Sequence, residues 1–399
     1  IYKIYVDMNN VLVLSNNSVS KTESNGRIHS YFVKEFIPGR LHNFYVRGIP
    51  DVEGVKYLSV SPKKALLSKL SFGLLNAKFN NKNGCASGSP KASPKSKKVF
   101  YHLIRSVAYL NNRRIIKNLS NYIILNNIDV IYLWGCNVPF LYNYAWKLAK
   151  KNNIDLITFT GEDYPLKDYN YISFKKSCLF NKFQRRFKKE NNKVYQFSKT
   201  NLFANKELKE LYCSKLNVGG EVSYFKSLLE KSNRKINKIN KILYAGNLYN
   251  ERANSLCEIA NHLQDISDAK IIVYGSCSKE VENKLKNIKN IIYKGVVDYK
   301  TVLSEIYDSD LLLHVEGFSK DYVSDCKYAF STKISDYLLT GLPIFVYGSK
   351  EISGIRFCSE IIPDFTAVTQ DELAKLDSIF NGEIQYKLDY NNIEKLFKA

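Results

Sequence analysis

Short apolar runs alternate along this chain with longer segments in which apolar residues recur at helical spacing. The runs have the length and composition of buried β-strands, and they are Lys3–Val6, Val130–Leu133, Leu156–Phe159, Ile242–Tyr244, Ile271–Val273, Ile291–Tyr293, Leu311–Val315 and Ile344–Tyr347. Segments with helical spacing include Asn254–Leu263, Tyr299–Asp308 and Thr332–Leu339. Hydrophobic strands that alternate with helices predict an α/β fold with parallel sheets covered on both faces.

The alternating elements fall into two series separated by a polar segment, Lys231–Lys241. We therefore expect two doubly wound, Rossmann-like domains. The expected divisions are an N-terminal domain at 1–230, a linker at 231–241, a C-terminal domain at 242–380 and a C-terminal helix at 381–399. That last helix is considered as an element that packs back on the N-terminal domain.

Charge is distributed unevenly over the 399 residues, whose formal net charge is +21. Residues 1–240 hold 41 Lys and Arg against 15 Asp and Glu, whereas 241–399 hold 18 against 23. A genome rich in Lys, Asn and Ile codons would load both halves, so the asymmetry favours a function. It predicts that the N-terminal half meets something anionic, such as a membrane surface, lipid phosphate or nucleic acid. No RNA- or DNA-reading motif accompanies the charge, so nucleic acid is not the expected partner.

The remaining global features favour a cytoplasmic protein. No apolar run approaches the roughly 20 residues of a membrane-spanning helix, and the first residues read as a strand rather than a signal peptide. The eight cysteines are scattered without a C-x-x-C pair, which is typical of a reducing compartment. Residues 80–98 form a Gly/Ser/Pro/Lys tract that predicts a mobile loop.

The most specific chemistry lies in the C-terminal half. Ile242–Arg252 reads as a strand, a turn at Gly246 and Asn247, and a helix that begins near Arg252. Ligands of open α/β sheets bind beyond the carboxyl ends of the strands, helix N-termini attract phosphate, and an arginine there suits a diphosphate. Further segments follow in the order Ile271–Ser276, Ile292–Val297, Tyr307–Phe318 and Ser331–Ile344.

This order of elements resembles the donor-binding domain of retaining, GT-B-fold glycosyltransferases of the family-4 type. The resemblance covers residues 241–360 well and residues 1–230 in outline. It implies a GT-B fold, in which two Rossmann-like domains face each other across a cleft. It also implies that Lys333 and Arg252 offset charge on the departing nucleotide diphosphate, and that Asp336 accepts hydrogen bonds from the ribose.

The resemblance assigns further donor contacts to the turns and to one displaced acid. Backbone at Gly246, Asn247 and Gly275 would approach the nucleotide, the base would lie at Gly295–Val297, and Ser331 and Thr332 would cradle the phosphate. The family usually has a glutamate eight positions before the ribose-binding acid, but here Tyr328 stands eight before Asp336. Glu316 is the first candidate for the displaced sugar contact.

In the N-terminal half, two carboxylates follow a predicted strand. Glu162 and Asp163 come directly after Leu156–Phe159, so they lie at a carboxyl end where similar enzymes contact the donor sugar or acceptor; the alternative is a helix N-cap by Asp163. Trp134 ends another strand and either lines the same cleft or packs in the core. The glycine-rich loop of the resembled family is reduced to Gly26, with Arg27 and His29 beside it as acceptor or phosphate contacts or as an exposed helix start.

A basic segment with aromatic residues at helical spacing runs from Ser177 to Lys193. Such a helix either binds an anionic lipid surface or packs an aromatic stripe into the core and leaves its basic side in solvent. The charge of this half leaves the two interpretations equally weighted.

Together these features imply a bacterial-type, retaining hexosyl- or N-acetylhexosaminyltransferase that is peripheral on the inner face of the cell membrane. It would use a nucleotide-sugar donor and a lipid-linked or polysaccharide-precursor acceptor, as in capsule or lipopolysaccharide biosynthesis. No metal or other cofactor is expected, because Lys333 and Arg252 replace a metal and Asp308-Ser309-Asp310 reads as helix capping. The alternative is a noncatalytic GT-B-fold binding or scaffold subunit of a glycan-assembly complex.

Overall fold

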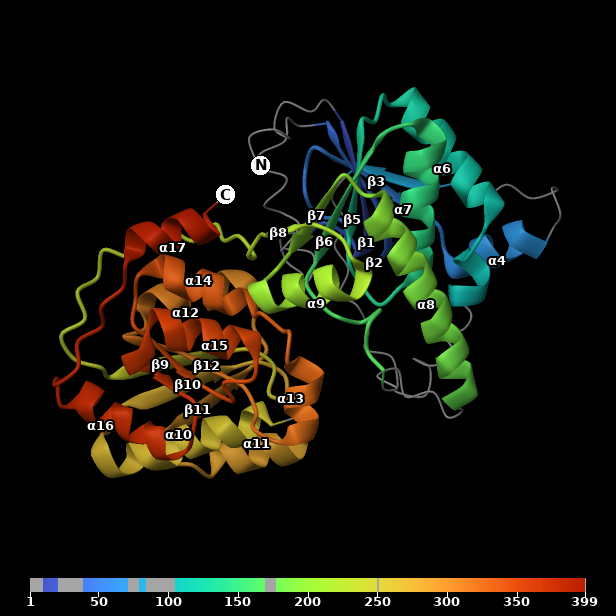
Figure 1. The fold of residues 1–399 in the computed structure, drawn as a ribbon. Coiled ribbons are helices and arrows are strands. Elements are labelled where there is room, and N and C mark those ends of the chain that lie inside the picture. Colours follow the sequence, from blue (N-terminus) through green and yellow to red (C-terminus); the bar gives the residue numbers. More distant parts are fainter. Residues whose placement is uncertain are drawn as a thin grey trace. The chain divides into compact units, whose positions relative to one another are not determined.

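The computed structural model describes residues 10–20, 39–70, 79–83, 105–168, 177–249 and 251–398. It divides into two compact units, Ile1–Ser223 (unit 1) and Tyr224–Ala399 (unit 2), and each is described by itself (Figure 1). The predicted strand Lys3–Val6, the residues Gly26, Arg27 and His29, and most of the 80–98 tract lie outside the described residues. Among the described residues, no helix combines the length and the apolar character needed to cross a membrane.

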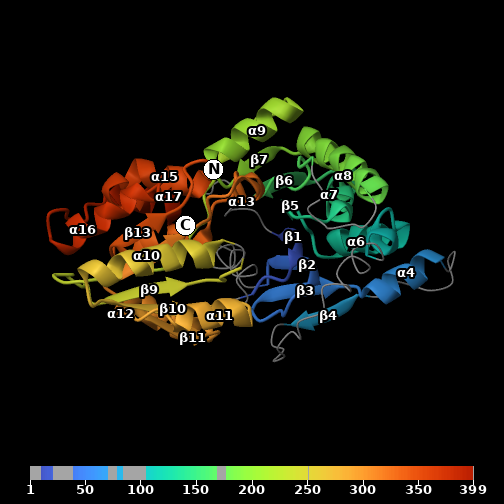
Figure 2. The same cartoon turned by 90° about the horizontal axis from the view of Figure 1, so that it is seen from below.

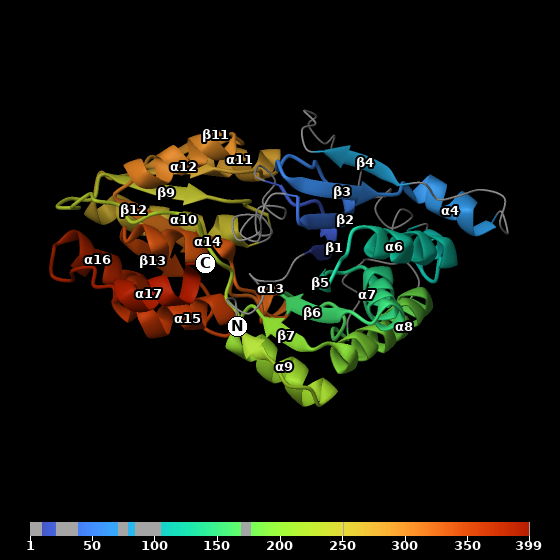
Figure 3. The ribbon, with the colours of Figure 1, turned by 90° about the horizontal axis from the view of Figure 1, so that it is seen from above.

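Unit 1 is built on an eight-stranded sheet with the strand order β4-β3-β2-β1-β5-β6-β7-β8, most of which can be followed in Figure 3. Its strands are β1 (Val11–Asn17), β2 (Leu41–Arg47), β3 (Val55–Ser59), β4 (Asn80–Asn83), β5 (Val130–Trp134), β6 (Asp155–Thr160), β7 (Thr200–Phe203) and β8 (Glu221–Val222). Its helices are α4 (Pro62–Leu70), α6 (Arg113–Leu125), α7 (Pro139–Asn152), α8 (Ser177–Phe197) and α9 (Lys206–Leu216). All strand pairs are parallel except β3 with β4, and α6, α7 and α8 lie together on one face.

Unit 2 is built on a six-stranded, fully parallel sheet with the order β11-β10-β9-β12-β13-β14. Its strands are β9 (Lys241–Ala245), β10 (Lys270–Tyr274), β11 (Ile291–Gly295), β12 (Leu311–Val315), β13 (Ile344–Tyr347) and β14 (Thr366–Ala367). Its helices are α10 (Arg252–Ile266), α11 (Lys279–Lys286), α12 (Tyr299–Asp308), α13 (Lys320–Cys326), α14 (Thr332–Thr340), α15 (Ser353–Ile361), α16 (Lys375–Phe380) and α17 (Tyr390–Phe397). Helices α10, α11 and α16 cover one face and α12, α14, α15 and α17 the other (Figures 1 and 2).

In both units the strand order reverses at one central pair, which is the arrangement of a doubly wound Rossmann sheet. The pair is β1 and β5 in unit 1 and β9 and β12 in unit 2. The predicted α/β class with two Rossmann-like units is therefore confirmed. So are the predicted strands from Val130 onward, most of whose apolar residues are buried, with Ile292 of β11 exposed as an exception.

The boundary between the units differs from the sequence-based one, because the polar segment 231–241 packs on unit 2. Arg234 donates hydrogen bonds to the carbonyl oxygens of Tyr307 (2.9 Å) and Ser309 (2.8 Å), and it pairs with Asp310 at 2.7 Å. The backbone N–H of Lys241 also donates to Asp310, at 2.9 Å. These contacts give charged and backbone groups of segment 231–241 partners in unit 2. The composition of the segment, taken alone, predicts a linker.

Helix α17 packs against α14 within unit 2. Its Phe397 is fully buried in an aromatic cluster with Tyr224, Phe330 and Phe357. Phe330 lies directly before the N-cap of α14, so the C-terminal helix supports the start of that helix.

Candidate functional site

The strongest candidate site lies in unit 2, beyond the carboxyl ends of β9 and β12. These are the strands at which the order reverses, and a ligand of a doubly wound sheet binds outside such a pair. Arg252 begins α10 after β9, Glu316 follows β12, and Lys333 lies in the first turn of α14. The fold thus brings together three residues that are far apart in the sequence.

Arg252 and Glu316 form a two-pronged ion pair. Nε of Arg252 donates to Oε2 of Glu316 at 2.9 Å, and Nη2 donates to Oε1 at 3.0 Å. Nη1 donates to Oδ1 of Asn247 at 2.9 Å, so the guanidinium is held from two sides. Such paired N–H···O bonds fix orientation as well as charge.

The carboxylate of Glu316 has two further partners, and its side chain is only 5% exposed. The hydroxyl of Tyr322 donates to Oε2, and Nε2 of His314 lies 3.5 Å from Oε1. Burial alone would raise the pKa of Glu316, but Arg252, His314 and the hydrogen bonds hold that pKa below its ordinary value. Burial lowers the pKa of His314 to about 3 despite the nearby Glu316, so the imidazole is neutral.

Lys333 is the second cation of the site, and its ammonium group has no counter-ion among the described residues. Among the described residues, no carboxylate or hydrogen-bond acceptor pairs with its ammonium group, which lies 4.9 Å from the ring centroid of Tyr244. Burial and the like charge of Arg252 lower the pKa of Lys333 to about 8, although Glu316 acts in the opposite direction. Ser331 caps α14, because its hydroxyl accepts a hydrogen bond from the N–H of Lys333 and its carbonyl accepts one from the N–H of Ile334 at 3.0 Å.

Two glycine turns pass close to the cations. A Cβ on Gly246 would lie 2.5 Å from Nζ of Lys333, and a Cβ on Gly275, whose φ is +147°, would lie 1.7 Å from the carbonyl oxygen of Gly246. The N–H of Gly275 donates to the carbonyl of Gly295 at 2.8 Å, which ties the turns after β10 and β11 together. Val297 follows in that last turn. Bare backbone therefore borders the two cations, as an approaching phosphate or ribose requires.

Helix α13 is anchored to the start of α10 through Glu251. Its carboxylate accepts hydrogen bonds from the N–H groups of Phe318 (3.0 Å) and Ser319 (2.9 Å) and from the hydroxyl of Ser319. A Cβ on Gly317 would meet Glu251 and Tyr322 within 2.8 Å, so only glycine fits between them. The loop after β12 is thereby fixed against the residue that precedes Arg252.

Asp336 lies one turn after Lys333 and is buried. Its Oδ1 accepts a hydrogen bond from the hydroxyl of Ser227 at 2.6 Å. Ser227 is itself held by the carbonyl of Phe397, to which its N–H donates at 2.9 Å. One carboxylate oxygen of Asp336, the predicted ribose contact, is therefore already hydrogen-bonded to the segment at the start of unit 2.

The N-terminal candidates lie in unit 1, at the carboxyl end of β6. Asp163 is buried and lies 3.5 Å from Nζ of Lys167, and the carbonyl of Glu162 accepts from the hydroxyl of Tyr212 at 3.2 Å. Trp134 stacks on Phe159 with ring centroids 4.4 Å apart. The carboxyl ends of β5 and β6 are therefore neighbours, as their positions in the sequence predict.

The predicted basic segment with aromatic residues, Ser177–Lys193, forms most of helix α8. Phe180 and Phe187 are buried, and Phe187 packs edge-on against Tyr142 of α7. The exposed residues of α8 include several cations and no acid, and the cations are Lys182, Arg185, Lys188, Lys189 and Lys193. Phe180 and Phe187 thus belong to the core and Phe183 is half-buried, while the exposed side of the helix is mainly basic and also includes Phe197.

The Asp308-Ser309-Asp310 segment has structural partners. Asp308 pairs with Lys241 at 2.5 Å, and Asp310 binds Arg234 and two backbone N–H groups. Within the described ranges, no group of three or more His, Cys, Asp or Glu side chains gathers as metal ligands would.

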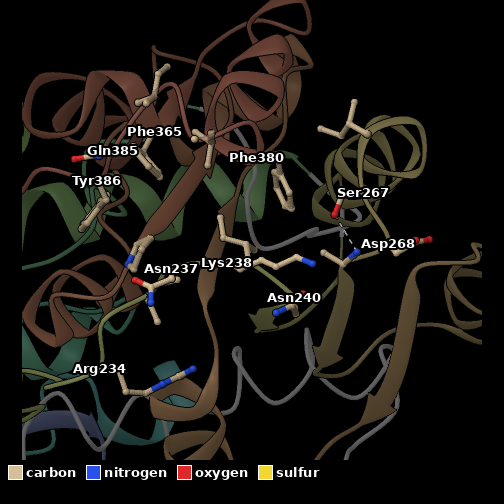
Figure 4. Close-up of a pocket in the computed structure, with 18 of the residues that line it drawn as sticks. Arg234, Asn237, Lys238, Asn240, Ser267, Asp268, Phe365, Phe380, Gln385 and Tyr386 are labelled. Carbon is tan, nitrogen blue, oxygen red and sulfur yellow. Dashed lines mark hydrogen bonds between the residues drawn. The ribbon is translucent and has the colours of Figure 1, made fainter.

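A separate hollow of about 950 Å³ lies in unit 2, beside the residues that precede β9, β10 and β13 (Figure 4). Its lining includes Arg234, Lys238, Asn240 and Phe380. Because it borders the amino ends of the strands, it is distinct from the site of Arg252 and Lys333.

Four residues of the site belong to no motif used in the sequence analysis, and they are Tyr244, Glu251, His314 and Tyr322. His314 is a polar residue inside an apolar strand and Glu251 directly precedes Arg252, so both positions offered a weak signal. Tyr244 and Tyr322 offered none, since each reads as an ordinary aromatic residue. Their roles depend on contacts that only the folded sheet creates.

Two neighbouring cations, the N-terminus of α14 and bare glycine backbone can together bind a diphosphate and stabilise charge on a departing one. The two Rossmann-like units define the class of fold: the chain has the GT-B fold, which is also the fold of solved glycosyltransferases. Among solved structures it is similar to a glycosyltransferase from Rickettsia africae, at 11% identity and a TM-score of 0.57 over 98% of this chain and 94% of that chain.

Two further structures show the same fold. Sucrose-phosphate synthase from Thermosynechococcus elongatus matches at 8% identity and a TM-score of 0.55, over 98% of this chain and 95% of that chain. A trehalose-6-phosphate structure from E. coli bound with UDP-2-fluoro glucose matches at 12% identity and a TM-score of 0.53, over 92% and 91%. No protein-family model and no curated protein matches the sequence.

Proposed function

We propose that this chain is a glycosyltransferase that moves a sugar from a nucleoside-diphosphate donor to an acceptor, with retention of anomeric configuration. The observation that carries the proposal is the position of two cations, Arg252 and Lys333, at the point where the strand order of a Rossmann sheet reverses. Among the described residues, Lys333 has no carboxylate as a counter-ion. Structures of the same fold that include a UDP-sugar complex support the proposal.

In this proposal the residues of unit 2 bind and activate the donor. Lys333, the first turn of α14 and the free protons of Arg252 bind the diphosphate and stabilise the negative charge that grows on it as the sugar leaves. The nucleotide is bordered by Gly246, Asn247, Gly275, Gly295 and Val297. The phosphate lies at Ser331 and Thr332, and the ribose binds Asp336. These cations replace a metal ion in that role.

The acceptor and its surroundings are assigned to unit 1. Glu162 and Asp163 contact the acceptor or the donor sugar, and the acceptor is a lipid-linked or polysaccharide precursor. The basic side of α8 holds the protein on an anionic membrane surface, which places such an acceptor within reach. The transferred sugar belongs to the hexose or N-acetylhexosamine class.

A donor panel tests the proposal. Thermal unfolding is measured with UDP-, GDP-, dTDP- and CMP-sugars, because a ligand that binds the native state raises its stability. We expect the nucleotide sugars of one base to raise the Tm. The same nucleotide sugar should release its nucleotide when an acceptor extract is added.

Two variants make the test specific to the site. Lys333→Ala should abolish both binding and transfer, whereas Lys300→Ala, on the exposed side of α12, should change neither. Full transfer by Lys333→Ala would refute the proposed site. Binding of a nucleotide sugar without transfer or hydrolysis would instead support the noncatalytic scaffold.

A further inference from the structure

Both oxygens of the Glu316 carboxylate already have partners. Oε1 has Nη2 of Arg252 at 3.0 Å and Nε2 of His314 at 3.5 Å, and Oε2 has Nε of Arg252 at 2.9 Å and the hydroxyl of Tyr322. The backbone at this residue is fixed as well. The N–H of Glu316 donates to the carbonyl of Tyr347 at 2.9 Å, and its carbonyl accepts from the hydroxyl of Ser255 at 2.8 Å.

These contacts determine how charge is distributed in the site. Glu316 neutralises Arg252, and Lys333 is left without a counter-ion, so the three groups carry one net positive charge. A buried carboxylate that lost a partner would be costly to keep ionised, and its rotation would release the guanidinium. The orientation of Arg252 therefore depends on what holds Glu316.

Tyr322 holds Glu316 at the same oxygen, Oε2, that accepts from Nε of Arg252. It lies on α13, whose N-terminus is capped by Ser319 and tied to Glu251. Gly317, which leaves room for both, lets the loop pass between Glu251 and Tyr322. The tyrosine is thus supported by contacts that do not involve the cations.

We infer that Tyr322 is a positioning residue that holds Glu316 as the counter-ion of Arg252, and thereby aims the guanidinium at a bound diphosphate. This inference rests on the proposed function, and it deepens it by giving Glu316 a role other than contact with the donor sugar. Helix α13 then contributes to donor binding through Glu316 and Arg252.

A double-mutant cycle tests the inference with inorganic pyrophosphate and UDP as calorimetric probes. Tyr322→Phe removes one hydroxyl and keeps the ring, and it should weaken the binding of both probes roughly 3- to 10-fold. In an Arg252→Met background the same change should have no further effect, because Tyr322 acts through Arg252. The control Tyr307→Phe loses a hydroxyl bonded to the backbone of Glu230, and it should leave both affinities unchanged.

The outcomes separate this inference from the proposed function. Additive effects of Tyr322→Phe and Arg252→Met, or unchanged affinity in Tyr322→Phe, would overturn the inference. Pyrophosphate binding with full coupling but without binding of any nucleotide would support the inference and refute the proposed function. Failure of the wild-type protein to bind either probe would overturn both.

Discussion

Gly246 and Lys333 approach so closely that no side chain fits between them: a Cβ on Gly246 would lie 2.5 Å from Nζ of the lysine. The obstacle is the end of a flexible side chain, so Gly246→Ala is expected to displace the ammonium rather than unfold unit 2. Diphosphate binding should weaken about 10-fold with little change in Tm, as measured by calorimetry and thermal unfolding.

Gly275→Ala is the matched comparison, and it should have the opposite outcome. Its Cβ would lie 1.7 Å from a backbone oxygen, at a φ of +147° that only glycine adopts easily. We expect a loss of about 2 kcal/mol or more in the free energy of unfolding, measured by urea denaturation. Equal stabilities of the two variants would contradict the described packing of the turns.

The depressed pKa of Lys333, about 8, predicts proton uptake when an anion binds. Above about pH 8 the free protein holds this lysine largely neutral, and a diphosphate favours its charged form, so binding raises the pKa and takes up a proton. UDP affinity should therefore fall as the pH rises through about 8. Calorimetry in buffers of different ionisation enthalpy would measure the uptake near pH 8.5, where the roughly pH 6 step of the phosphate is complete.

Lys333→Arg is the control for this titration. An arginine stays charged at every pH of the experiment, so this variant should bind UDP without proton uptake and with constant affinity between about pH 7 and 9.5. Proton uptake that persists in Lys333→Arg would assign the titration to another group.

Glu316→Gln distinguishes a counter-ion from a sugar contact. If Glu316 only balances Arg252, the substitution should change the affinities for a nucleotide sugar and for its free nucleotide by the same factor. A contact to the sugar would instead weaken the nucleotide sugar alone. The ratio of the two dissociation constants, measured by calorimetry, is therefore expected to stay at its wild-type value.

The basic side of α8 predicts salt-sensitive binding to anionic vesicles. Because Phe180 and Phe187 are buried, attraction should be mainly electrostatic and worth roughly 1 kcal/mol for each cation near the surface. Replacing Lys182, Lys188, Lys189 and Lys193 by Gln should release the protein from phosphatidylserine vesicles in a sedimentation assay. The same change at Lys279, Lys300, Lys320 and Lys350, which are exposed in unit 2, should have little effect.

Helix α17 is expected to stabilise unit 2 through Phe397. This side chain is fully buried among aromatic rings, so Phe397→Ala should cost about 3–5 kcal/mol of unfolding free energy in urea denaturation. Phe197→Ala, at a phenylalanine that is 41% exposed in unit 1, should cost less than about 1 kcal/mol.

The sequence by itself determined the alternating elements from Val130 onward and the residues that bring charge to the site. Buried parallel strands need continuous apolar runs, so β5, β6 and β9 to β13 were readable from local composition. It did not reveal β1, whose short apolar run ends in the buried polar residue Ser15, or β2, whose apolar run is interrupted by His42 and Asn43. Those groups are buried because partners from distant segments satisfy them, as when Asn43 donates to the carbonyl of Val13 and His42 bonds Tyr122.

Only the tertiary structure decided which of the site residues have partners. Arg252 and Glu316 are 64 positions apart, and Ser227 and Asp336 are 109 apart, so no local pattern could pair them. The polar segment after β12 gives no local indication of a role, yet in the fold it forms α13, the helix that carries Tyr322 to Glu316. The sequence supplied the charges, and long-range packing determined that Arg252 is neutralised while Lys333 is not.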